Sequence, residues 1–185
     1  MGWRKVFGIV GIVVAAEIVL FVVGFVVVVY SGIYNVAATK PEPGATDWVL
    51  STTMDRSVHH HAAGIRVSAT YESPDPSEGY EHFSEMCVAC HGAPGIEPSE
   101  MGKGLNPRAL DLSEAANEWT PSEVYWIVKN GIKMSGMPAF GPTHDDEKLW
   151  NITAFVKRLP GLAPEQDAMR GKATEAHTTE SEHAE

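Results

Sequence analysis

The feature that most restricts the fold of this chain is an apolar run over residues 6–30, VFGIVGIVVAAEIVLFVVGFVVVVY. A helix needs about 20 apolar residues to cross a bilayer core, and this run has 25 with Glu17 as its single ionisable side chain. We therefore expect residues 1–30 to form a transmembrane anchor. Arg4 and Lys5 precede the run, so the chain after Tyr30 should lie on the outer, periplasmic side of a bacterial cytoplasmic membrane.

A cleaved secretory signal is the alternative explanation of the same run. Its basic start fits such a signal, and the small residues Val36-Ala37-Ala38 resemble a cleavage site. The apolar stretch is, however, about twice as long as the apolar region of an ordinary signal. Its length favours an uncleaved anchor.

Two features of the anchor point to a partner inside the membrane. A charged side chain at the position of Glu17 costs about 3 kcal/mol on insertion scales, so this carboxyl is expected to be neutral or to face another protein. Gly11 and Ala15 are four residues apart, a spacing that lets a second helix approach closely. The alternative is a solitary anchor that tolerates one protonated glutamate.

Composition divides the rest of the chain. The net charge is −10 and the acidic excess lies after residue 30, which argues against nucleic acid as a partner. Residues 31–76 read as a linker and a juxtamembrane amphipathic helix, the helix being expected within 48–70 and a Pro-broken linker at 71–78. Residues 77–163 read as the compact domain, and the acidic, polar tail 164–185 is expected to be disordered.

The compact domain is predicted to be all-α. One helix is expected from Ser77 to about Ala89, a second from Pro121 to a stop at Gly131, and a third over about 145–159. No stretch shows the apolar alternation of a strand.

The chemistry of the chain is concentrated in Cys87-Val88-Ala89-Cys90-His91, which holds both of its cysteines. A thioredoxin-like dithiol requires a strand-helix-strand context, which is missing, and a structural zinc site requires further ligands. Covalent haem attachment needs only two thiols for thioether bonds and the next imidazole for the iron. The pattern therefore predicts one covalently attached haem c, with His91 as an axial ligand.

Met137, in Gly-Met-Pro-Ala-Phe, is the best candidate for the second axial ligand of the iron. A methionine between glycine and proline on a loop is poorly suited to filling a core. Met134 is the nearest rival. The weaker rivals are His82, His144 and the run His59-His60-His61, which is more typical of a solvated or interfacial helix face.

Residues 77–163 resemble a class I cytochrome c, with CVACHG near the start, GIKMSGMPAFG in the sixth-ligand loop and LWNITAFVKRLP in the closing helix. The resemblance implies the cytochrome c fold, following the transmembrane and juxtamembrane helices. It also implies that the first and last helices cross at a small residue surrounded by aromatic side chains. The matching positions are Gly79, Phe83, Ile152 and Phe155.

In that family a proline carbonyl accepts the hydrogen bond of the axial histidine, and Pro107 is the better candidate here, with Pro94 as the alternative. The loop between the CVACH motif and Pro107, which contains APGIEPSEMGKGLN, departs from the usual pattern of the family. Four further residues are weaker candidates for contact with the haem edge or propionates, with core packing an equal alternative for the aromatic ones: Arg108, Trp119, Tyr125 and Trp126.

These features predict an electron carrier and not an enzyme. The expected protein is a membrane-anchored cytochrome that exchanges single electrons with redox partner proteins, between respiratory complexes or as a subunit within a larger one. Two alternatives stay open. One is a haem sensor or ligand-binding protein with a labile sixth ligand. The other is a mainly structural subunit that anchors a membrane complex.

Overall fold

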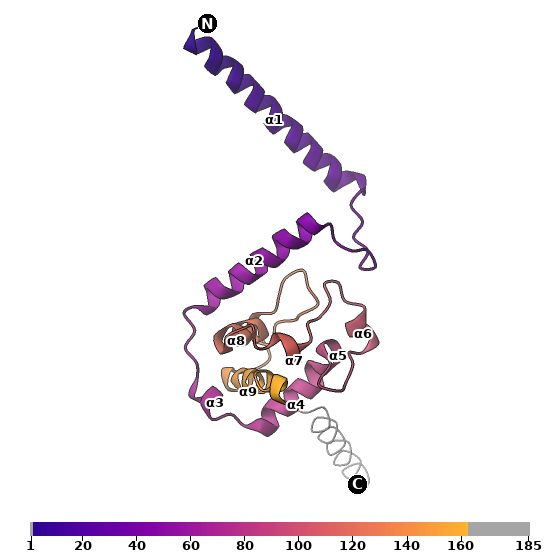
Figure 1. The fold of residues 1–185 in the computed structure, drawn as a ribbon, viewed down its shortest axis with the longest axis vertical. Helices are drawn as coiled ribbons and strands as arrows, with labels where there is room; N and C mark the ends of the chain where they lie inside the picture. Colours follow the sequence, from indigo (N-terminus) through magenta and orange to yellow (C-terminus); the bar gives the residue numbers. More distant parts are fainter. Residues whose placement is uncertain (1, 163–185) are drawn as a thin grey trace. The chain divides into compact units, whose positions relative to one another are not determined.

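The N-terminal helix of the computed structural model contains the whole apolar run (Figure 1). The structure describes residues 2–162, and α1 (Trp3–Ser31) is followed by Gly32 in the left-handed conformation, with φ of +70°. By length and composition α1 can cross a membrane. The segment up to Lys40 is one unit, and the chain from Pro41 onward forms a second.

Within the described residues, the regular elements of the second unit are all helices, joined by loops that include one isolated bridge between Ala93 and Ile96. The prediction of an all-α fold behind an apolar N-terminal helix is therefore confirmed for residues 2–162. The predicted disordered tail, 164–185, lies outside the described residues.

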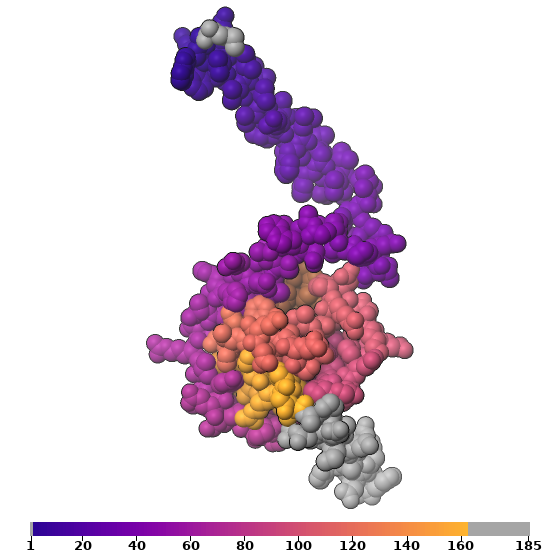
Figure 2. Space-filling model, in the orientation of Figure 1, coloured from indigo at the N-terminus to yellow at the C-terminus, as the bar shows by residue number. Residues whose placement is uncertain are grey.

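The helix expected within 48–70 is α2 (Gly44–Ala62), which starts earlier and ends before Gly64. It packs against α8 (Pro121–Asn130), and Figure 2 shows their surfaces adjoining. Only its C-terminal half has a buried face: Val58 and Ala62 are buried, whereas Leu50 is exposed. The amphipathic pattern therefore marks a contact with the rest of the unit.

The expected linker at 71–78 is partly helical. The short helix α3 (Ala69–Glu72) packs on α9 (Asp146–Val156), where the ring of Tyr71 meets that of Trp150 edge-on at 5.9 Å. The next helix, α4 (Pro76–Met86), is capped by Asp75 and not by Ser77, because the Asp75 carboxylate accepts the first main-chain N–H groups of the helix.

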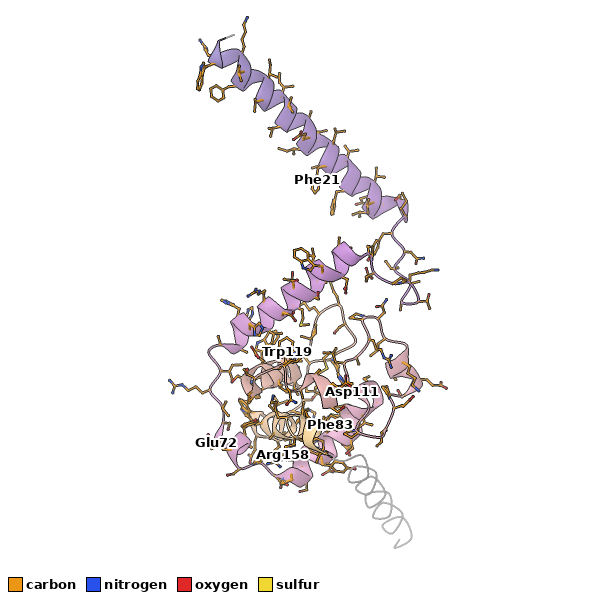
Figure 3. The ribbon with its side chains drawn as sticks, viewed as in Figure 1. Phe21, Glu72, Phe83, Asp111, Trp119 and Arg158 are labelled. Atoms are coloured by element: carbon orange, nitrogen blue, oxygen red, sulfur yellow. The ribbon has the colours of Figure 1, made fainter. Side chains whose placement is uncertain are left out.

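The centre of the unit is the crossing of α4 and α9. Gly79 makes this close approach possible, since a Cβ atom there would lie 2.6 Å from the main-chain oxygen of Asn151. Phe83, which is labelled in Figure 3, is buried in the unit. Its ring centroid lies 5.1 Å from that of Phe155, and Ile152 is buried on the same face of α9. The crossing expected from the family resemblance is thus present at the residues named.

Two caps fix the helices on which the remaining loops depend. Thr120 and Glu123 form a reciprocal capping box at the start of α8, and Gly131 ends this helix with φ of +65°, as predicted. Asp145 caps α9, which ends at Val156 and is followed by a 3-10 turn, η1 (Leu159–Gly161).

Candidate cofactor site

Cys87 and Cys90 lie at the end of α4 and in the adjoining turn α5 (Val88–His91). They are not joined in a disulfide; Cys87 is buried, and Cys90 is partly exposed. Burial, followed by the charge of Cys90, raises the pKa of Cys87 to about 12. The Cys87 thiol is therefore neutral near pH 7.

The imidazole of His91 is already oriented for a ligand. Its Nδ1 donates a hydrogen bond to the main-chain oxygen of Leu110 at 2.8 Å, which fixes the ring and leaves Nε2 as the free nitrogen. The sequence pointed instead to the carbonyl of Pro107 or Pro94. That expectation is wrong here. The carbonyl that accepts the bond belongs to Leu110, three residues after Pro107, and Pro107 itself is exposed.

Glycines bring main chain against main chain around this turn. A Cβ atom on Gly102, in α6 (Glu100–Lys103), would lie 2.9 Å from Cα of Cys90, so α6 packs directly on the attachment turn. Gly92 follows His91 with φ of +69°, and a Cβ atom there would be 2.6 Å from the oxygen of Ile96. The cysteines and the histidine thus sit on a tightly packed segment.

The loop that carries Met137 folds back on the end of α8. Ile132 N–H donates to the oxygen of Met137, while the N–H groups of Phe140 and Gly141 donate to Val128 and Lys129. Met137 is partly buried in this loop. Met134 has a positive φ of 61° and is 81 % exposed, so the structure distinguishes the two methionines.

The methionine loop also contacts the segment that follows the attachment turn. A Cβ atom on Gly136 would lie 2.5 Å from the Leu105 side chain, and Leu105 comes three residues after Gly102. The two candidate ligand-bearing segments are therefore connected through residues 102–105. Two cysteines, an oriented imidazole and a nearby thioether loop fit a covalently attached haem.

The weaker candidates have other described contacts. Arg108 is exposed. Tyr125 is buried, stacks on Trp150 at 4.2 Å and donates its hydroxyl to Asp146. The indoles of Trp119 and Trp126 face α2, and no described contact assigns any of these residues to a cofactor.

The indoles of Trp119 and Trp126 contact the histidine run on α2. His59 stacks on Trp119, with ring centroids 5.6 Å apart, and donates to the carboxylate of Glu123. The ring of His61 lies 5.6 Å from that of Trp126, and Figure 3 labels Trp119. The run is therefore an interface with α8, one of the roles that the sequence left open. Its spacing gave the face of the helix but not its partner.

Residues 74–156 match the family model described as Cytochrome C oxidase, cbb3-type, subunit III. No curated protein and no solved structure matches the chain.

Proposed function

We propose that residues 74–156, which match the cbb3-type cytochrome family model, form a class I c-type cytochrome domain with covalently attached haem c, and that the chain uses it to pass single electrons at the outer face of a membrane. The supporting observation is the state of His91, whose Nδ1 is bonded to Leu110 while Nε2 is left for the iron. The haem supplies the reversible Fe(II)/Fe(III) couple, and the protein sets its potential and exposure.

Met137 is the proposed sixth ligand. Its loop is fixed at the start by Gly131 and at the end by the main-chain bonds of Phe140 and Gly141 to α8, so the thioether is presented by a held segment. Ligation by histidine and methionine raises the reduction potential relative to two imidazoles. It also closes the iron to small ligands, as an electron carrier requires.

The helix α1 is the proposed membrane anchor, with the cytochrome domain on the periplasmic side. The oxidase-type family model supports a place in a respiratory membrane complex. Electrons would then pass within that complex or between it and another. Glu17 and the close-approach pair Gly11 and Ala15 are the proposed contacts with a neighbouring transmembrane helix.

The ligand assignment is tested by comparing Met137→Ala with the matched control Met134→Ala. We expect the wild type and the control to show the weak far-red band of a methionine sulfur on ferric iron and to exclude carbon monoxide when reduced. The Met137→Ala protein should lose the band, bind carbon monoxide and have a lower reduction potential. A wild type that itself binds carbon monoxide would instead support the sensor alternative.

Electron flow in membranes distinguishes transfer from a mainly structural role. If Met137→Ala assembles normally but respiratory electron flow is lost, the haem is on the electron path; unchanged flow contradicts the proposal. Purification in mild detergent tests the membrane contact, since Glu17→Leu should co-purify fewer partner subunits than the wild type. A wild-type protein that purifies alone would contradict that contact.

A further inference from the structure

Two histidines considered as rival ligands lie against each other. His82 is on α4, five residues before Cys87, and His144 follows the methionine loop. Their ring centroids are 5.2 Å apart at an interplanar angle of 81°, an edge-to-face contact. The pair therefore connects the helix that leads into the attachment cysteines with the segment that ends the methionine loop.

Each imidazole has further contacts that fix its place. The His144 ring meets that of Phe140 edge-on at 5.7 Å, and its Nδ1 lies 2.9 Å from the Thr143 hydroxyl. The main-chain N–H of His144 donates to the main-chain oxygen of Phe140. His82 Nε2 lies 4.0 Å from a carboxylate oxygen of Glu78, and the His82 side chain is 19 % exposed. A row of contacts thus runs from α4 through both imidazoles to Phe140, three residues from Met137.

The position of this contact suggests its use. The main-chain bonds described for the methionine loop run to α8, at Val128 and Lys129. The imidazole pair adds a contact to α4, which carries the cysteines. The loop also contacts the Leu105 side chain at Gly136. A loop held at α4 as well as at α8 and Leu105 keeps its place relative to the haem.

We propose that His82 and His144 are positioning residues that hold the methionine loop closed, so that Met137 stays on the iron. This inference rests on the proposed role of Met137. Neither imidazole needs to bind the metal, and the contact is made by the ring faces and edges. Loss of one ring should increase the fraction of molecules in which the loop is open.

The experiment measures how readily added imidazole replaces the sixth ligand in the ferric, full-length protein in detergent. Edge-to-face pairs of this kind change an equilibrium by about two- to tenfold, so His82→Ala and His144→Ala should bind imidazole that much more tightly. Both should also weaken the far-red methionine band. His144→Phe keeps a ring in place and should restore wild-type binding.

Two controls separate positioning from general loss of stability. His60→Ala removes an exposed histidine of α2 and should leave imidazole binding unchanged. Val58→Ala removes buried methyl groups from α2, and should lower the melting temperature without tightening imidazole binding. The double variant of His82 and His144 should resemble either single one, since both remove the same contact.

Unchanged imidazole binding in both alanine variants would overturn the proposal, as would equally tight binding in Val58→Ala. Failure of the ligand assignment gives a different result: the wild type lacks the far-red band, and Met137→Ala binds imidazole no better than the wild type does.

Discussion

Replacing Gly79 by alanine tests the helix crossing on which the whole domain depends. The added Cβ would lie 2.6 Å from the main-chain oxygen of Asn151, 3.1 Å from its carbonyl carbon and 3.1 Å from Cβ of Phe155. The nearest atoms belong to the main chain or to a Cβ, so no side-chain rotation can relieve the contact. The helices α4 and α9 must separate by roughly half an ångström.

The size of the effect follows from two opposing terms. Separation loosens the contacts of the Phe155 ring with Phe83, at 5.1 Å, and with Tyr80, at 5.7 Å. Overpacking in a core typically costs about 1–3 kcal/mol, and a main-chain clash belongs at the upper end. Alanine favours the helix over glycine by about 1 kcal/mol. We expect a net loss of about 2 kcal/mol in the free energy of unfolding.

The assay is thermal and denaturant unfolding of the haem-loaded protein, followed by circular dichroism. A loss of this size lowers the melting temperature by about 8–16 °C in a domain of roughly 60–100 residues. Gly64→Ala is the matched control, because nothing lies within 4 Å of a Cβ atom there. If Gly79→Ala unfolds at the same temperature as Gly64→Ala, the close crossing of α4 and α9 is not present in the protein.

Two further predictions concern the start of α8. Thr120→Ala should lower the free energy of unfolding by about 1 kcal/mol through loss of the capping bond to Glu123, and Thr120→Ser should recover most of it in the same denaturant assay. Burial alone would raise the pKa of Glu123, but its hydrogen bonds with Thr120 and His59 hold it below its ordinary value of 4.5. The folded state therefore favours the carboxylate, and the stability it contributes is present above about pH 4.5 and is lost as the pH falls through the lowered pKa. Glu123→Gln should remove this part of the acid sensitivity in unfolding titrations, and a wild type and variant with parallel pH profiles would refute the assignment.

Local spacing explains what the sequence could predict. Gly79 and Phe83 stand at fixed distances from Cys87 on one helix, and Gly131 follows a regular apolar pattern, so each could be placed without knowing the rest of the fold. Asp75 and Ser77 are both good capping residues two positions apart. Asp75 is the cap, and not Ser77, because Pro76 occupies the first turn of α4.

Contacts between segments far apart in the sequence could not be predicted, because they do not depend on local spacing. Leu110 supports His91 through a main-chain oxygen, which every residue possesses and no sequence pattern reveals. The partners of His59 and His82 are 60 or more residues away, at Trp119 and His144, and depend on how α2 and the methionine loop fold back. Side-chain type indicated possible roles for these histidines, and only packing distinguished among them.

The packing of α2 onto α8 sets the length of the segment that connects α1 to the cytochrome domain. Because α2 is held by Val58, Ala62 and His59, the connection between α1 and α2 is residues 32–43, which span at most about 40 Å when fully extended. A connection of residues 32–75 would span at most about 150 Å, so the packing of α2 shortens the reach of the domain nearly fourfold. With α1 in the membrane as proposed, a partner anchored nearby meets the haem more often, whereas a distant acceptor must come to it.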